Sequence, residues 1–405
     1  MSSRVLILSW EYPPIVAGGL SRHVSKLSEA LVRAGVEVCV LTRGSGEMAS
    51  EQTTAGVVVH RVRETEMPRD LDAFVAWVEG MNSHMHAAGR RLGKRLRFDL
   101  VHGHDWLVAG AAASLAERLR CPYLTTIHAT EYGRHEGWVQ QHPQSYIHRI
   151  ETWMAGRADR VVTCSHYMRG HVADVFDIDE ARITVIPNGI DRGDLHPVDD
   201  LVALRARFAD PGERLVLLVG RLVYEKGFQL ALDAMPQVIR RSGRVRFLVA
   251  GSGTHEGELR RQSARLGLDA HGTFMGWIGD DVLHSLYRIA DLCVVPSIYE
   301  PFGLVALEAM ASGCPCIVAD TGGLREVVPS SDVGLRFRSR NPRALARMMR
   351  CLLDDDALRE RLVAEASVHV ARFDWNDIAR QTAQVYAELG GAGGAAAPAA
   401  TLRPA

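Results

Sequence analysis

Two glutamates, Glu300 and Glu308, stand eight residues apart in the segment SIYEPFGLVALEAMASG. A helical pattern begins at Phe302-Gly303-Leu304, and the first backbone N–H groups of a helix have no partner within it, so they can bind a phosphate. A carboxylate one turn further on, at Glu308, suits the paired hydroxyls of a ribose. The same two carboxylates could instead serve as acid and base in glycoside hydrolysis, or be unrelated surface groups.

The segment GRLVYEKG places two cations, Arg221 and Lys226, directly after an apolar run. Open α/β sheets bind ligands beyond the carboxyl ends of their strands, and two cations there could neutralise a departing diphosphate. A solvated pair of cations at a helix start is the simpler alternative, but positive charge is mildly unfavourable at that position. We therefore favour an anion site, and we expect removal of Lys226 to leave thermal stability unchanged or slightly raised.

A pair of glycines, Gly18 and Gly19, follows the first apolar run, where a strand gives way to a helix. Glycine lets the backbone approach a ligand closely, and the helix start favours an anion. An ordinary tight turn would contain the same residues. The glycines are thus compatible with a second phosphate-binding turn.

Histidines and one carboxylate follow two further apolar runs, in VHGHDW and TTIHAT. His104, Asp105 and His128 would line one wall of a cleft if both runs are neighbouring strands. His102, His104 and Asp105 could instead bind a metal, because H-x-H places two imidazoles on one strand face. Asp105 could also simply cap the next helix. No further ligand cluster is evident in the sequence, so we predict no metal site.

Several familiar motifs are absent from the sequence. There is no GxxxxGK[ST] loop, and GSGTHEG, from Gly251, departs from the dinucleotide fingerprint at its sixth position, Glu256. The seven cysteines lie mostly in apolar runs, and Cys314-Pro-Cys316 lacks the spacing of a redox or zinc motif. We therefore expect buried thiols in a reducing compartment, and neither a P-loop nor a nicotinamide site.

The elements that must position these groups are short runs rich in Val and Ile, separated by helical patterns. They begin at Arg4, Val36, Val57, Asp99, Pro122, Arg160 and Ile183 in the first half, and at Arg214, Val245, Gly272, Asp291 and Cys314 in the second. Runs of this length without clean alternation are typical of strands buried on both faces of a parallel sheet. The sequence predicts an α/β protein with two doubly wound, Rossmann-like domains that face a cleft.

The turn-rich stretch NGIDRGDLHPVDD, from Asn188 to Asp200, marks the expected boundary between the domains. We assign residues 1–190 to the first domain and 191–374 to the second. A helix over 375–389 then crosses back to the first domain. The low-complexity segment 390–405 is expected to be a disordered tail.

Overall composition excludes some partners. With 47 basic and 48 acidic residues the formal net charge is −1, which argues against nucleic-acid binding. No apolar stretch reaches the ~18 residues needed to span a bilayer, and the start of the chain does not read as a signal peptide. We expect a cytoplasmic protein without a transmembrane segment. Peripheral membrane contact and the oligomeric state stay open.

Taken together, these motifs resemble those of glycosyltransferase family 4, the retaining enzymes of GT-B fold. SIYEPFGLVALE matches the E-x7-E signature of that family, and GRLVYEKG matches its basic donor-site motif. The resemblance runs from RVLILSWEYPP to FDW. HGHDW followed by TIHAT is similar to the glycogen and starch synthase-like branch, especially actinobacterial α-1,4-glucosyltransferases.

The resemblance implies a role for each matching residue. Those implied to act on the transferred sugar, the acceptor or the leaving group are Asp105, His128, Arg221, Lys226 and Glu300. Those implied to bind the donor are Gly18, Gly19, Phe302, Gly303, Leu304 and Glu308. The first domain would then face the acceptor, and the second would bind the nucleotide sugar.

The activity implied is transfer of a hexose, glucose above all, from a nucleoside diphosphate sugar to an α-glucan or sugar-phosphate acceptor, with retention and no cofactor. ADP-glucose or UDP-glucose is the favoured donor. The first loop, Val16-Ala17-Gly18-Gly19, lacks the lysine usual in glycogen synthases. Maltose-1-phosphate synthesis and α-mannosyl transfer therefore stay open. A sugar-nucleotide epimerase or a non-catalytic nucleotide-sugar-binding protein agrees less well with the full motif set.

Overall fold

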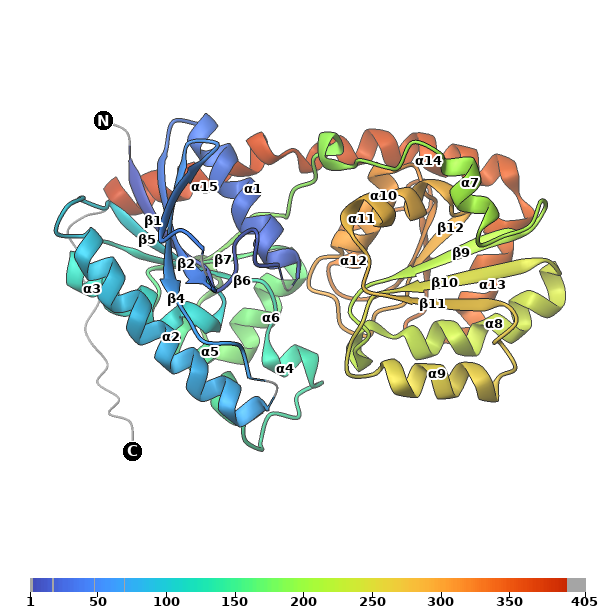
Figure 1. The fold of residues 1–405 in the computed structure, drawn as a ribbon, viewed down its shortest axis with the longest axis horizontal. Coiled ribbons are helices and arrows are strands. Elements are labelled where there is room, and N and C mark those ends of the chain that lie inside the picture. The colour runs from blue at the N-terminus through green and yellow to red at the C-terminus, as the bar shows by residue number, and fades with distance from the viewer. Residues whose placement is uncertain (1–2, 17, 47, 69, 392–405) are drawn as a thin grey trace.

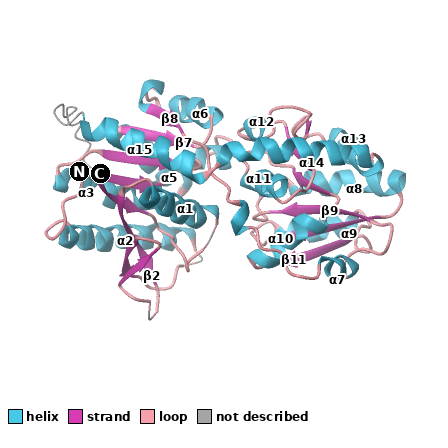
Figure 2. Ribbon diagram, turned by 90° about the horizontal axis from the view of Figure 1, so that it is seen from above, coloured by secondary structure: helices cyan, strands magenta, loops and turns pink. Residues whose placement is uncertain are grey.

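The computed structural model describes residues 3–391 apart from 17, 47 and 69, and these form two α/β domains (Figure 1). Each domain is a sheet with helices packed on both faces (Figure 2). The protein therefore has the doubly wound two-domain architecture that the sequence predicts. No helix in the described part of the chain is both long enough and apolar enough to cross a membrane.

The described residues of the first domain form an eight-stranded sheet in the order β3-β4-β2-β1-β5-β6-β7-β8. Its strands are β1 (Arg4–Leu8), β2 (Glu37–Gly44), β3 (Glu51–Thr54), β4 (Val57–Arg63), β5 (Leu100–His104), β6 (Tyr123–Ile127), β7 (Arg160–Thr163) and β8 (Ile183–Val185). Its helices are α1 (Gly19–Arg33), α2 (Leu71–Leu92), α3 (Ala109–Leu119), α4 (Glu131–Arg134), α5 (Gln144–Arg157) and α6 (His166–Phe176). All pairings are parallel except that of β3 with β4.

The described residues of the second domain form a six-stranded parallel sheet in the order β11-β10-β9-β12-β13-β14. Its strands are β9 (Arg214–Val219), β10 (Val245–Ala250), β11 (Gly272–Gly276), β12 (Leu292–Val295), β13 (Cys316–Ala319) and β14 (Leu335–Phe337). Its helices are α7 (Leu201–Ala206), α8 (Phe228–Ser242), α9 (Glu256–Arg265), α10 (Asp280–Ile289), α11 (Leu304–Ala311), α12 (Leu324–Val327), α13 (Pro342–Asp354) and α14 (Asp356–Val370).

The central strands are buried on both faces, as their apolar sequences predict. Consecutive residues of β1, from Val5 to Leu8, are 0% exposed, and Leu215 to Leu218 in β9 are equally buried. The strand order reverses between β1 and β5 in the first sheet and between β9 and β12 in the second. Ligands of such sheets bind beyond the carboxyl ends of the strands at these switch points.

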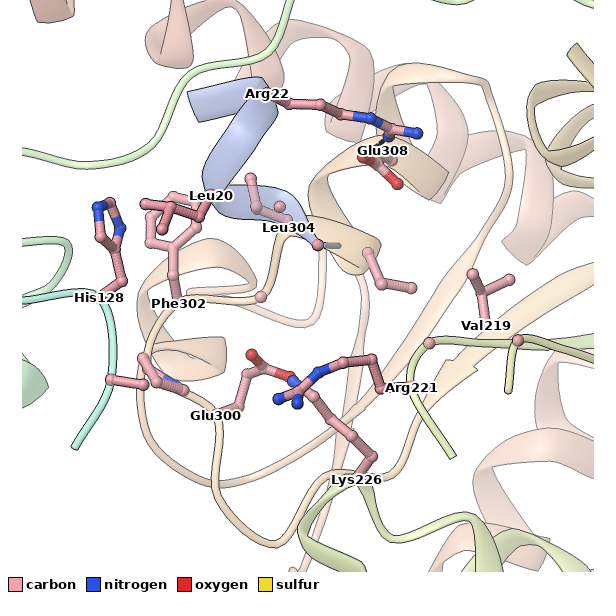
Figure 3. Close-up of a pocket in the computed structure, with 18 of the residues that line it drawn as sticks. Leu20, Arg22, His128, Val219, Arg221, Lys226, Glu300, Phe302, Leu304 and Glu308 are labelled. Atoms are coloured by element: carbon pink, nitrogen blue, oxygen red, sulfur yellow. Dashed lines mark hydrogen bonds and ion pairs between the residues drawn. The ribbon is translucent and has the colours of Figure 1, made fainter. Parts of the chain in front are cut away.

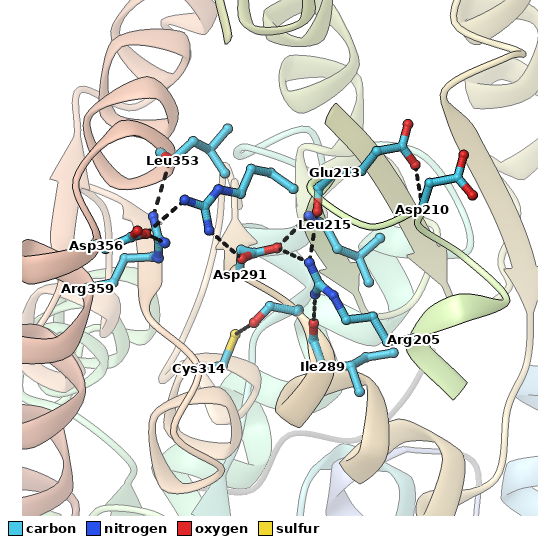
Figure 4. A network of polar contacts seen from close by, with 12 residues as sticks. Arg205, Asp210, Glu213, Leu215, Ile289, Asp291, Cys314, Leu353, Asp356 and Arg359 are labelled. Atoms are coloured by element: carbon cyan, nitrogen blue, oxygen red, sulfur yellow. Dashed lines mark hydrogen bonds and ion pairs between the residues drawn. The ribbon is translucent and has the colours of Figure 1, made fainter. Parts of the chain in front are cut away.

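Ion pairs connect the amino-terminal ends of β9 and β12, away from the switch point (Figure 4). Asp291, just before β12, pairs with Arg205 at 2.8 Å and with Arg214 at 3.2 Å. The same carboxylate accepts the backbone N–H of Leu215 at 2.7 Å. Since Arg205 belongs to α7, this network fixes the segment that follows the first domain, at the strand ends away from the switch point.

The last helix, α15 (Trp375–Gly391), packs against α1 and β5 of the first domain. Figure 1 shows it in red, returning from the second domain across the first. Its Tyr386 hydroxyl lies 2.8 Å from Nδ1 of His102 in β5. The helix continues two residues past the expected end at 389, and the rest of the expected tail, 392–405, lies outside the described residues.

Candidate active site

A cavity of about 520 Å³ lies between the two domains, at the carboxyl ends of both sheets. The predicted site residues that line it are Gly18, Gly19, His128, Arg221, Lys226, Glu300, Phe302, Gly303, Leu304 and Glu308. Figure 3 shows several of them converging on one space from both domains. Residues separated by almost three hundred positions in the chain therefore share one cavity, because the two switch points face each other.

The cations Arg221 and Lys226 line the part of the cavity that the second domain forms. Nζ of Lys226 is 2.8 Å from Oε2 of Glu300, and the hydroxyl of Ser297 donates to the same oxygen at 2.9 Å. Arg221 extends beside them (Figure 3) and is 3.7 Å from Glu225. Burial lowers the pKa of Arg221 from its ordinary value. This ion pair with Glu300 argues against the expectation that removing Lys226 would leave thermal stability unchanged or slightly raised.

Two glycines with positive φ shape the loops that carry these groups. Gly227, directly after Lys226, has φ +70°, and a Cβ there would lie 2.0 Å from the carbonyl oxygen of Pro296. Gly303, at the start of α11, has φ +115°, and its Cβ would lie 2.6 Å from Cδ2 of Leu324. Only glycine satisfies both conditions. The lysine and the free N–H groups of α11 are thus held at the cavity by backbone geometry.

Glu308 faces the cavity from α11 with its carboxylate already engaged. The Tyr287 hydroxyl donates to Oε2 at 3.0 Å, and Nη1 of Arg22 lies 3.3 Å from Oε1. Burial raises the pKa of Glu308, and Arg22 opposes that shift. Arg22 belongs to α1 and also pairs with Asp280 of α10, so it joins the two domains beside Glu308. Sequence reasoning missed Arg22, although its place one turn after Gly18 and Gly19 was a usable signal.

Three histidines form the first domain's wall of the cavity region: His23 of α1, His104 of β5 and His128 after β6. Nδ1 of His104 is 3.1 Å from Nε2 of His128, and the rings of His23 and His128 are 4.6 Å apart. Burial lowers the pKa of His128 to about 4. Burial, followed by the neighbouring imidazoles, lowers the pKa of His104 well below its ordinary value. The wall is therefore made of neutral imidazoles.

Asp105 lies behind this wall and not on it. Its carboxylate is 8% exposed, and Oδ1 accepts the backbone N–H of His128 at 2.8 Å. Burial raises the pKa of Asp105 to about 6, against the opposing backbone N–H groups of His128 and Ala129. It makes no side-chain cap to the helix that follows. The alternative that Asp105 caps this helix is therefore wrong, and its contact with acceptor or sugar stays a prediction. The structure gives Asp105 the role of fixing the loop that carries His128.

The alternative metal set of His102, His104 and Asp105 is not brought together either. Both ring nitrogens of His102 are engaged, by Tyr386 at 2.8 Å and by the hydroxyl of Thr126 at 2.7 Å. Asp105 is turned toward the His128 backbone. Of that set only His104 keeps a ring nitrogen without a hydrogen-bond partner among the described residues.

A second hollow of about 810 Å³ adjoins the cavity and shares Arg134, Arg221 and Glu225 with it. Aromatic side chains line it, and two are well exposed: Trp138 at 78% and Tyr224 at 52%. None of these aromatic residues was singled out by the sequence, because their gathering around one hollow depends on the tertiary structure. The two spaces therefore lie on either side of these three shared side chains.

Comparison with known proteins agrees with this architecture. Residues 17–193 match the model described as Glycosyltransferase Family 4, and residues 204–369 match Glycosyl transferases group 1. A glycogen synthase of Mycobacterium tuberculosis is 39% identical over 396 residues, covering 95% of this chain and 94% of the relative. The chain belongs to glycosyltransferase family 4. It is thus a glycosyltransferase that uses a nucleotide sugar.

Solved structures show the same fold. A sucrose-phosphate synthase from Thermosynechococcus elongatus superposes with a TM-score of 0.82 at 26% identity, over 96% of this chain and all of that one. The catalytic domain of starch synthase IV from Arabidopsis thaliana, bound to ADP and acarbose, gives a TM-score of 0.77 at 20% identity, over 96% of this chain and 100% of that chain. The GT-B fold of this family 4 glycosyltransferase is thereby established.

Proposed function

We propose that this family 4 glycosyltransferase moves glucose from ADP-glucose or UDP-glucose to an α-glucan, with retention at the anomeric carbon. The observation that carries the proposal is the grouping of Arg221, Lys226, Glu308 and the start of α11 around one cavity. Two cations and free helix N–H groups suit a diphosphate, and a buried carboxylate suits ribose hydroxyls. The similarity to a glycogen synthase supports glucose as the sugar.

In this proposal the donor diphosphate lies between the two cations and α11. The ribose binds Glu308, where its hydroxyls replace or share the contact that Arg22 makes at 3.3 Å. The base then lies toward Trp277 and Ile278, which line the same cavity beyond β11. This arrangement directs the sugar toward His128 on the opposite wall.

Negative charge on the diphosphate grows as the glycosidic bond breaks. Its attraction to Lys226 is therefore stronger in the transition state than in the ground state. Lys226 can turn from Glu300 to the departing phosphate over a short distance. The Glu300 carboxylate is held by Ser297 as well as by Lys226. We therefore favour departure and attack on the same face of the sugar over a covalent intermediate on Glu300.

The second hollow is our candidate for the acceptor. Exposed aromatic rings such as Trp138 and Tyr224 suit the apolar faces of sugar rings. Its charges are paired internally, with Arg134 3.5 Å from Glu131 and Arg221 3.7 Å from Glu225. A phosphorylated acceptor would have to compete with these carboxylates for a cation. This favours a neutral glucan over the sugar-phosphate acceptor of maltose-1-phosphate synthesis.

Replacement of Trp138 tests the assignment. In Trp138→Ala the KM for maltooligosaccharides should rise by roughly 2- to 10-fold, the scale of an aromatic contact, with the donor KM unchanged. Trp153→Ala is the matched control, because Trp153 is 40% exposed and is not among the residues lining either space. Unchanged glucan KM, or better turnover with glucose 1-phosphate than with glucan, would contradict the neutral-glucan assignment.

A further inference from the structure

The histidines His23, His104 and His128 come from three separate segments, yet their ring nitrogens lie within 4.8 Å of one another. α1 supplies the first, the end of β5 the second, and the loop after β6 the third. The ring of His23 packs against α15, where the centroid of the Trp375 ring lies 5.5 Å from that of His23. The backbone of His128 is held by Asp105 at 2.8 Å. The three imidazoles are thus fixed in place by the fold.

Two ring nitrogens of these histidines are buried without a hydrogen-bond partner among the described residues. They are Nδ1 of His23 and Nε2 of His104, in side chains that are 7% and 0% exposed. Asn188, which lines the cavity beside His23, interacts with that imidazole and partly opposes the lowering of its pKa by burial. A buried polar atom left unsatisfied costs about 1–3 kcal/mol, so two in one place require an explanation.

We propose that His23, His104 and His128 bind one first-row transition-metal ion, for which Zn²⁺ is the natural probe, and that the bound ion inhibits the enzyme. Neutral imidazole is the ligand that zinc, copper and nickel prefer, whereas magnesium and manganese prefer oxygen ligands. Zinc–nitrogen bonds of about 2.0–2.1 Å require the nitrogens to approach one another by small ring rotations. His102 is not a ligand, because both its nitrogens are already engaged.

The inhibitory half of this inference rests on the proposed function. His23 and His128 also line the donor cavity, so the fourth coordination position of the ion is open to a ligand from that side. Binding would take Nε2 of His128 from its 3.1 Å contact with His104 and turn the ring that faces the transferred sugar. The metal-free protein is accordingly the active form, and the ion acts as an inhibitor.

Titration of the metal-free full-length protein with Zn²⁺ by calorimetry at neutral pH tests the site directly. We expect one ion per chain, and affinity at least ~10-fold weaker in His23→Gln and in His104→Gln. His84→Gln is the matched control, since the His84 side chain is 62% exposed and pairs with Glu64 far from the three ligands. Equal zinc affinity in the wild type and both ligand variants would overturn the site.

The visible spectrum of bound Co²⁺ tests the metal site in the wild-type protein, without any variant. Co²⁺ added to the wild-type protein should give the intense visible bands of a four-coordinate nitrogen site, and Zn²⁺ should remove them. Weak bands of a six-coordinate ion, or none, would contradict the proposal even if a variant failed to fold. Nucleoside diphosphate binding by each variant checks that it is folded.

Measurements of turnover with and without Zn²⁺ test the inhibition separately. Zn²⁺ should lower wild-type turnover reversibly, with recovery on adding EDTA, and the ratio of rates with and without zinc should return to near one in His104→Gln. Zinc that binds at the three histidines without changing turnover would overturn inhibition and leave the site. Absence of any transferase activity would count against the proposed function, and calorimetry would still decide the site.

Discussion

Replacing Lys226 by alanine should affect both chemistry and folding. The lysine is 2.8 Å from Glu300, with side chains that are 23% and 10% exposed. Loss of one stabiliser of the leaving diphosphate should lower kcat by at least ~10²-fold, or about 2.7 kcal/mol of transition-state stabilisation, with a smaller change in donor KM. The Glu300 carboxylate would also be left partly buried without its cation.

The stability cost lies between that of an exposed and that of a buried pair. Exposed pairs contribute up to about 1 kcal/mol, and breaking a fully buried pair costs about 3–5 kcal/mol, so we expect about 1–3 kcal/mol here. The melting temperature should therefore fall by several degrees. The double variant Lys226→Met with Glu300→Gln should recover much of that loss, because neither charge remains, but it should not recover kcat.

Steady-state kinetics and thermal denaturation on the same preparations provide the assay. Lys26→Ala is the control, because Lys26 makes an ion pair with Asp194 at 2.6 Å and is not among the residues that line the cavity. It should lose some stability and keep kcat. Near-normal kcat in Lys226→Ala would refute the leaving-group assignment, and unchanged stability would refute the role given to its pair with Glu300.

Three further outcomes follow from the same site. Glu308→Gln should weaken nucleoside diphosphate binding by ~1–3 kcal/mol in calorimetry while the protein stays folded, and unchanged affinity would remove Glu308 from the ribose site. Activity should survive excess EDTA, because protein cations take the place of a metal at the diphosphate; complete loss that is restored by manganese or magnesium would contradict this. Gly227→Ala should lower both stability and kcat, since its Cβ would lie 2.0 Å from a carbonyl oxygen, whereas Gly170→Ala has no neighbour within 4 Å and should be harmless.

The sequence predicted the sheets well where burial is strong. Every apolar run that was interpreted as a strand is one, because strands buried on both faces must be apolar throughout. The two missed strands are β3 and β14. All four residues of β3, Glu51–Thr54, are exposed at a sheet edge, and β14 has only three residues, Leu335–Phe337. Both segments are strands because their backbones pair with a neighbouring strand, and such pairing cannot be recognised from amino-acid composition.

For the site, motif residues were placed correctly at the cavity but their contacts were not foreseen. The pairing of Lys226 with Glu300 joins residues 74 positions apart, and that of Arg22 with Glu308 joins residues 286 apart. The first contact depends on how the loops after β9 and β12 meet, and the second on how the two domains face each other, and local pattern encodes neither. The aromatic residues of the second hollow were missed for the same reason. The partner of Asp105 was not foreseen, because it is a backbone N–H, which no sequence motif displays.

The most direct test of the account is the anomeric configuration of the product made from α-configured ADP-glucose or UDP-glucose and a maltooligosaccharide, read by proton NMR. We predict a new α-linked glucose, formed in step with release of nucleoside diphosphate, and release only when the acceptor is present. A β-linked product, or release of nucleoside diphosphate without any acceptor, would contradict retaining transfer to a glucan.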